Sequence, residues 1–208
     1  HNDVALIKYV QMPADDTTQQ VHALMLDQIL AAPFFDSLRT EQQLGYIVGG
    51  RYLPLVRVPG LVFLVQSPSH SVADVNAKVD AFVKQYFSVI EKKDEAWFEQ
   101  QKKALLVQLE EKPKNQVEQA ERFFDDLILG YKAFDSRAQK IAALQKMTRQ
   151  DLLNAYQTVL LAPEKRELLL VSPGKAGIQS WLEGEAKLFQ RVEDVDALKK
   201  SQPSYSLQ

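Results

Sequence analysis

The order in which strand-like and helix-like apolar patterns follow one another constrains the fold of this 208-residue chain most. Apolar runs of strand length stand near the start, twice in succession within residues 45–66, and once at residues 167–171. Residues 71–160 instead carry the helical period. Strands that follow one another directly, with helices gathered elsewhere, differ from the alternating order of a parallel sheet. The sequence therefore predicts an α+β fold: a small, mostly antiparallel sheet with helices packed on one face.

Four strands are predicted, at Val4–Val10, residues 45–53, residues 61–66 and residues 167–171. The middle two are separated by a turn bounded by prolines, which is typical of a hairpin with a longer loop. Gly49–Gly50 lies inside the second strand and indicates either a β-bulge or a close approach of another backbone.

The helices are predicted from apolar periodicity together with local start and stop signals. Ser71 and Thr148 are typical N-terminal caps, each followed three residues later by an aspartate. Pro33 is expected to end the first helix, and Gly130 the fifth. The predicted helices cover roughly residues 17–32, 34–43, 71–91, 94–111, 116–129, 136–145 and 148–160.

A boundary is predicted where Pro173–Gly174 follows the last strand, because the chain becomes more polar beyond it. Residues 1–174 are expected to form one α+β domain, and residues 175–208 a C-terminal extension or tail. Residues 201–208 read as a loose end. One short helix is expected in the extension, on the apolar side chains Ile178, Trp181 and Leu182.

Composition excludes several classes of function. A net charge of -2 and a pI of about 6.0 disfavour a nucleic-acid or membrane-surface binder. No apolar run reaches the 18 residues of a membrane span, and the absence of cysteine rules out disulfides and a cysteine nucleophile. The first residues resemble no signal peptide and include no initiator methionine, so we expect a piece of a longer chain, the parent polypeptide.

Metal and nucleophile motifs are missing from this sequence. Its three histidines, His1, His22 and His70, form neither H-E-x-x-H nor H-x-x-E-H, and no G-x-S-x-G occurs. The stretch Ser67–His70 is interpreted as a polar turn before the Ser71 cap. No metal site is therefore predicted in this chain.

One stretch stands out from this background, Phe34–Val48, where a helix end, a turn and a strand start follow closely. Arg39 and Tyr46 flank that junction, seven residues apart. An arginine offers five fixed donors and a tyrosine one hydroxyl, so together they can bind a peptide carbonyl or an oxyanion. By spacing alone, an arginine in a surface ion pair and a tyrosine packed at a strand end explain the two residues better than a shared binding site does.

The residues Leu38–Val48, LRTEQQLGYIV, resemble a signature R-x-x-x-Q-L-G-Y-x-V in the C-terminal half of the pitrilysin and insulin-degrading enzyme family. Further similar features follow in the family's order, and the resemblance covers roughly residues 2–172. These further features are the strand ending at Leu64–Ser67, the break at Lys112–Lys114, and the stretch from Phe134–Asp135 to Thr148–Leu152.

The resemblance implies a zinc metalloendopeptidase of four similar α+β domains in two halves, in which only the N-terminal half binds zinc. It implies that this chain binds no zinc, is inactive alone, and acts with the N-terminal catalytic half on peptide substrates. By the same resemblance, Tyr46 donates to the scissile carbonyl or oxyanion and Arg39 binds the substrate backbone and orients Tyr46. Phe35 stands where the family has an aromatic residue that lines the substrate pocket.

Two alternatives remain open at this point. The chain can be a non-catalytic scaffold or peptide-binding module of a processing-peptidase-like complex, or an unrelated α+β binding domain with a chance match. No nucleic-acid or membrane partner is expected. Resemblance to bacterial members predicts a periplasmic location, with the cytoplasm as the alternative.

Overall fold

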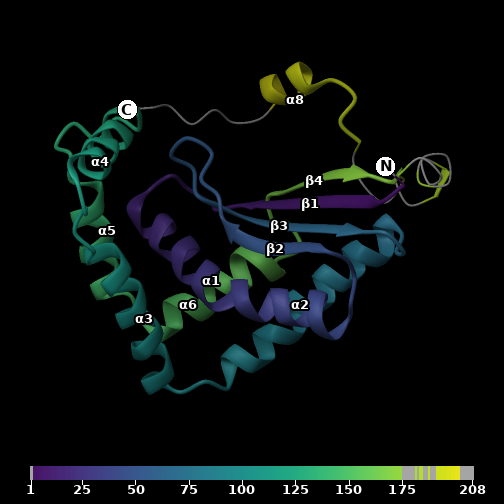
Figure 1. Ribbon diagram of the computed structural model, residues 1–208, viewed down its shortest axis with the longest axis horizontal. Helices are drawn as coiled ribbons and strands as arrows, with labels where there is room; N and C mark the ends of the chain where they lie inside the picture. Colours follow the sequence, from purple (N-terminus) through teal and green to yellow (C-terminus); the bar gives the residue numbers. More distant parts are fainter. Residues whose placement is uncertain (1, 175–180, 182, 185–186, 188–190, 202–208) are drawn as a thin grey trace.

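The computed structural model describes residues 2–174, 181, 183–184, 187 and 191–201 (Figure 1). Its strands are β1 (Val4–Gln11), β2 (Ile47–Tyr52), β3 (Gly60–Ser67) and β4 (Glu167–Ser172). Its α-helices are α1 (Thr17–Phe35), α2 (Val72–Glu91), α3 (Glu95–Glu110), α4 (Gln116–Ile128), α5 (Ser136–Lys146), α6 (Arg149–Tyr156) and α8 (Val195–Ser201). Two π-helical turns, η1 (Asp36–Glu41) and η2 (Gln157–Leu161), continue α1 and α6.

The four strands form one sheet in the order β2-β3-β1-β4, and every neighbouring pair is antiparallel. Alternate residues of β1 point to opposite faces, so Leu6 and Val10 are buried while Ile7 is exposed. The buried face packs against α1, α2 and α6, which lie on one side of the sheet (Figure 1). The predicted α+β class, with helices on one face of an antiparallel sheet, is confirmed.

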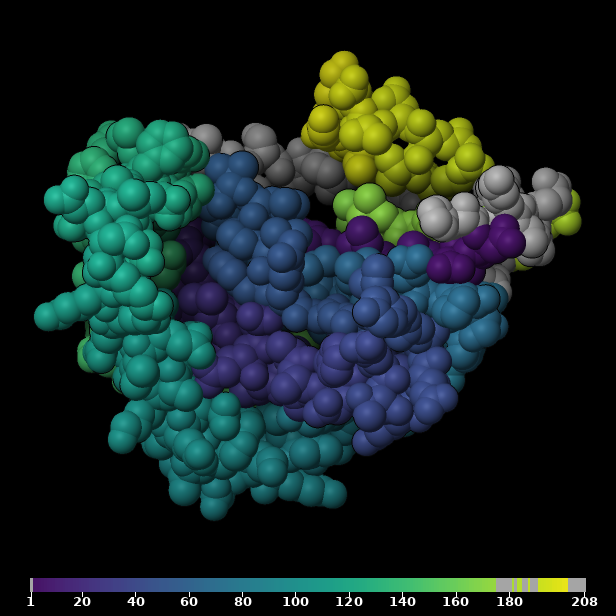
Figure 2. All heavy atoms as spheres, viewed as in Figure 1, coloured from purple at the N-terminus to yellow at the C-terminus, as the bar shows by residue number. Residues whose placement is uncertain are grey.

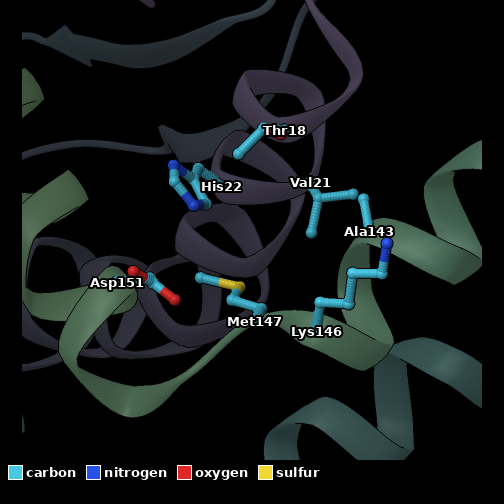
Figure 3. Close-up of a pocket in the computed structure, with 7 residues that line it drawn as sticks. All are labelled: Thr18, Val21, His22, Ala143, Lys146, Met147 and Asp151. Atoms are coloured by element: carbon cyan, nitrogen blue, oxygen red, sulfur yellow. The ribbon is translucent and has the colours of Figure 1, made fainter.

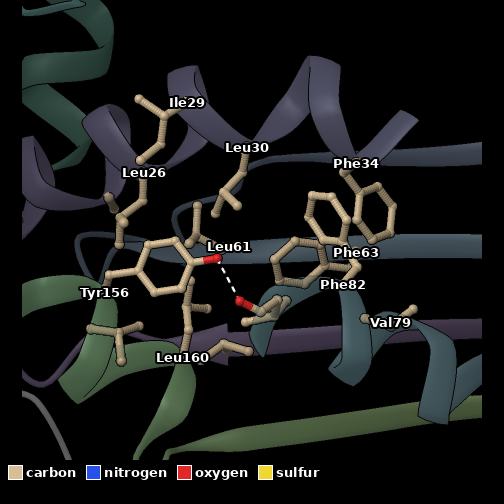
Figure 4. Close-up of a cluster of buried hydrophobic side chains, with 14 of the residues drawn as sticks. Leu26, Ile29, Leu30, Phe34, Leu61, Phe63, Val79, Phe82, Tyr156 and Leu160 are labelled. Atoms are coloured by element: carbon tan, nitrogen blue, oxygen red, sulfur yellow. Dashed lines mark hydrogen bonds between the residues drawn. The ribbon is translucent and has the colours of Figure 1, made fainter. Parts of the chain in front are cut away.

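The core between sheet and helices contains a cluster of aromatic and aliphatic side chains (Figure 4). The ring of Phe34 from α1 lies 5.1 Å from that of Phe63 on β3 and 5.3 Å from that of Phe82 on α2. The buried Tyr156 donates its hydroxyl hydrogen bond to the backbone oxygen of Val83, 2.8 Å away. This bond satisfies a polar group that burial would otherwise leave costly.

The prediction that Pro33 ends the first helix is wrong, because α1 runs through Pro33 to Phe35. A proline removes one backbone donor, but the fully buried Phe34 and Leu38, which both follow it, anchor the continued helix to the core. The backbone then widens into η1, where the Asp36 N–H is shared between the carbonyls of Ala32 and Pro33.

The hairpin of β2 and β3 is confirmed, with two changes of detail. Strand β2 begins at Ile47 rather than at Gly45. The β2–β3 register runs without interruption through Gly49–Gly50, so the bulge is wrong. The alternative of a close backbone approach is not found either: an added Cβ at Gly50 would meet the Phe63 side-chain ring at 3.3 Å, and one at Gly49 would have nothing within 4 Å.

Helices α3, α4 and α5 form an arm beside the sheet, with α4 at its far end (Figure 1). Figure 2 shows this arm in teal along the left border of the molecule. The arm meets the core through Phe98 and Leu105 of α3 and Leu144 of α5, which are buried.

The C-terminal extension is only partly described. Helix α8 was not predicted; Asp194 caps its first turn by accepting a hydrogen bond from the Ala197 N–H. Ile178 and Leu182 lie outside the described residues, whereas Trp181 packs against the core. No helix among the described residues is long and apolar enough to cross a membrane.

Candidate functional site

The candidate site lies where α1 ends and the chain turns into β2. Phe35 is the last residue of α1, and Arg39 follows in η1, four positions later. Residues four apart on a helix share a face, so the two side chains are neighbours. A π-helical turn widens the backbone by one residue, and such turns occur frequently at functional sites.

The turn after Arg39 is held by two buried leucines. Leu38 and Leu44 are both fully buried, and the Leu44 N–H donates to the Leu38 carbonyl at 3.0 Å. Between them Gln43 has a φ of 52°, in the left-handed region that side chains other than glycine enter at a cost. The buried pair therefore holds a strained residue in place and reverses the chain over six residues.

Gly45 then brings the chain against β3. A Cβ added at this position would lie 1.8 Å from the carbonyl oxygen of Gln66, so only glycine fits. This contact fixes the backbone one residue before Tyr46. The close approach explains why a glycine is needed at this point of the turn.

The three predicted site residues come together as a stack. The Arg39 guanidinium carbon lies 5.1 Å from the ring centroid of Phe35 and 5.0 Å from that of Tyr46. Both distances are within the range of a cation–π contact. The Tyr46 side chain is 83% exposed, and no hydrogen bond within the described part of the chain uses its hydroxyl.

This arrangement offers donors without an acid–base pair. The Arg39 fork and the Tyr46 hydroxyl can donate to a carbonyl or a negatively charged oxygen. Among the described residues no group of three histidines, cysteines or carboxylates could hold a metal ion. The cluster can therefore bind and orient a substrate, but it contains no group that activates water.

The described histidines do not take part in this site. The Nδ1 atom of His70 lies 3.1 Å from the hydroxyls of Ser67 and Ser69, in the polar turn before the Ser71 cap, as predicted. His22 lies 17 positions before Arg39 on the same helical path, about 25 Å away at 1.5 Å per residue.

His22 lines a pocket that was not predicted from the sequence (Figure 3). It measures about 210 Å³ and lies between α1, α5 and α6, with Asp151 on the His22 side and Lys146 opposite. Burial lowers the pKa of His22, although the nearby Asp151 opposes that shift. Hydrogen bonds from Thr148 lower the pKa of the Asp151 carboxyl. The sequence could have indicated this pocket only through the helical positions of its lining residues, and these residues lie far apart in the sequence.

Comparison with known proteins relates the chain to proteases. The family described as "PQQ synthase PqqF-like, C-terminal lobe domain 4" matches residues 25–124. Insulin-degrading enzyme of Drosophila melanogaster is 29% identical over 78% of this chain and 16% of its own length. Protease 3 of Escherichia coli is 28% identical over 95% of this chain and 20% of its own.

A solved structure agrees with these relatives. The crystal structure of pitrilysin matches this chain with a TM-score of 0.84 and 26% identity, over all of this chain and 22% of the pitrilysin chain. The chain thus spans about a fifth of the length of the relatives it matches. The resemblance stated from residues 38–48 is confirmed by a comparison that extends across the whole domain.

Proposed function

Because this chain is a C-terminal domain of the pitrilysin family, in sequence and in fold, we propose that it serves a zinc metalloendopeptidase that degrades peptides. In this proposal its parent polypeptide holds zinc in an N-terminal half, outside these 208 residues. The chain contributes substrate-binding and transition-state-stabilising side chains across the active site.

The observation that carries this proposal is the stack of Phe35, Arg39 and Tyr46. Stacking on two rings orients the arginine fork, and the exposed tyrosine hydroxyl is left free to donate. Donors held in place before the reaction stabilise a developing oxyanion without reorganisation. A surface ion pair would have placed a carboxylate beside Arg39, and none of the described ion pairs includes that residue.

In the proposed reaction, Tyr46 donates a hydrogen bond to the oxygen of the scissile carbonyl as it gains negative charge. Arg39 donates to backbone carbonyls of the bound peptide and keeps the Tyr46 ring in place. Phe35, whose ring also lies against the guanidinium, contacts an apolar substrate side chain. The described residues do not fit a zinc site, so water activation is assigned to the rest of the parent polypeptide.

The test compares the chain with its parent polypeptide in hydrolysis of an internally quenched peptide at fixed zinc concentration. We expect the parent to cleave and the 208-residue chain to be inactive. Cleavage by the isolated chain at a comparable rate would overturn the proposal. A parent that binds the peptide without cleaving it would instead support the scaffold or peptide-binding module. The periplasmic location remains a prediction, which fractionation of the producing cell would check.

A further inference from the structure

Helix α4 exposes large apolar side chains far from the candidate site. Its only buried residue is Asp126. Six side chains define what is called here the α4 face: Val117 (65% exposed), Phe123 (47%), Phe124 (60%), Leu127 (62%), Ile128 (57%) and Phe134 (46%) of the following loop. Contiguous apolar surfaces of this kind mark interaction sites.

The helix is attached to the domain by its polar side. The Asp126 carboxylate accepts hydrogen bonds from the backbone and the hydroxyl of Ser136, and the Arg122 guanidinium donates to the Glu111 carbonyl at 2.9 Å. At 100° per residue, the apolar residues of α4 fill an arc of about 140° that contains neither Asp126 nor Arg122. An amphipathic helix normally buries its apolar arc against the domain. In α4 the polar side faces the domain and the apolar arc is exposed.

The stability of a thirteen-residue helix such as α4 requires more than these polar contacts. Isolated helices below about 12–15 residues are marginal in water, and most helical stability in proteins comes from packing of the apolar face. Within the described residues Phe123 makes an edge contact with Phe134, with ring centroids 5.7 Å apart, yet the apolar side chains of the arc stay 47–65% exposed. A further surface is required to cover the rest.

We propose that the α4 face docks onto a part of the parent polypeptide outside these 208 residues, and so holds this domain in the assembled enzyme. The inference rests on the proposed function, in which such a parent exists. The matched relatives are about five times longer than the matched segment, so the partner surface has ample chain to come from.

The chemistry of the partner surface follows from the charges around the arc. Residues 110–126 carry six acidic and three basic side chains; Glu121 borders the arc directly, and Asp125 lies beyond it on the same side. A complementary surface is therefore apolar at its centre and basic at its rim. A second copy would bring the same acidic rim against itself, which disfavours a symmetric dimer through this face.

Two other occupants fit less well. Residues 202–208 contribute only Tyr205 and Leu207 as large apolar side chains, too few to cover the α4 face. The peptide substrate is proposed to bind at Tyr46, just before the start of β2, whereas α4 stands at the opposite end of the molecule (Figure 1). The α4 face is thus assigned to assembly rather than to substrate binding.

Hydrogen exchange of residues 116–128 tests the assignment, measured in the 208-residue chain and in the parent polypeptide. We expect exchange to slow at least about tenfold in the parent, since docking closes a helix that opens locally when alone. Equal exchange in both proteins would overturn the proposal. Protection that rises with concentration of the isolated chain would assign the face to a second copy instead. Faster exchange after deletion of residues 202–208 would assign it to that segment.

A variant pair separates docking from folding. Phe124→Ser with Leu127→Ser should remove the protection in the parent while leaving the circular dichroism of the isolated chain unchanged. The matched control is Val89→Ser on α2, another exposed apolar residue (45%), which should retain the protection. Tyr46→Phe should also retain it, so a failed peptidase assay with intact protection would reject the proposed function alone.

Discussion

The guanidinium carbon of Arg39 lies 5.0 Å from the ring centroid of Tyr46, although seven residues and a chain reversal separate them. The contact exists because η1, the left-handed Gln43 and the close approach of Gly45 together turn the chain so that the Tyr46 side chain lies beside that of Arg39. It leaves the Tyr46 ring exposed while the Arg39 guanidinium lies against it, which suits the proposed role as a donor.

Removal of the Tyr46 hydroxyl should reduce turnover rather than stability. In the parent polypeptide Tyr46→Phe is expected to lower kcat by about 10²–10³, the usual loss for one oxyanion donor. Tyr52→Phe is the matched control, since that ring is partly buried at the end of β2, the strand that follows Tyr46, and burial raises its pKa to about 12. Steady-state kinetics on both variants decides, and a Tyr46→Phe loss below about threefold would contradict the assigned role.

Replacement of Arg39 by lysine should not preserve function. Lysine keeps the charge but loses the planar fork that lies over the rings of Phe35 and Tyr46. We expect kcat/KM of the parent to fall by about 10–100-fold, corresponding to loss of hydrogen bonds to a charged group. In the isolated chain the ring proton shifts of Tyr46 should move toward values of an unstacked tyrosine. Unchanged NMR shifts would show that the stack does not orient the ring.

Gly45→Ala should destabilise the domain, because its Cβ would meet the Gln66 carbonyl at 1.8 Å. The expected loss in unfolding free energy is about 1–3 kcal/mol, as for other overpacked sites. Gly49→Ala is the control, since a Cβ there has nothing within 4 Å. Urea unfolding of the isolated chain measures both, and equal stability of the two variants would refute the close approach.

Gln43→Gly should stabilise the turn. Glycine removes the left-handed strain of about 1–2 kcal/mol, less its own larger loss of chain entropy, for a net gain of about 0.5–1 kcal/mol. At the neighbouring Gln42, where φ is -88°, the same change should destabilise. Urea midpoints that move in the same direction for both variants would argue against strain at Gln43.

The stability of the chain should depend on His22 between neutral and mildly acidic pH. Burial lowers the folded-state pKa of His22, so below about pH 6.5 the unfolded state binds more protons and stability falls. Above that pH the group contributes nothing. His22→Gln should flatten the pH dependence of the unfolding free energy between pH 7 and 5, whereas His70→Gln, which leaves His22 in place, should retain it. Identical slopes in His22→Gln and the unaltered chain would reject this linkage.

Helix starts were predictable because capping is a contact between residues three positions apart. Ser71 accepts from the Asp74 N–H, and Thr148 forms a reciprocal capping box with Asp151, as the sequence indicated. Pro33 was misjudged because its local cost is outweighed by the burial of Phe34 and Leu38, which no local pattern displays.

The amino-acid sequence alone determined the α+β order, the caps, the hairpin and the pair Arg39 and Tyr46 as candidates, because these depend on periodicity and on short spacings. Only the tertiary structure decided that Arg39 lies over the rings of Phe35 and Tyr46 and that α4 presents its apolar arc outward. Both results depend on contacts outside the helical and strand periods: Gly45 against the Gln66 carbonyl for the stack, and Asp126 with Ser136, ten positions later, for the orientation of α4. Contacts of this kind select one among several arrangements that local propensity permits equally.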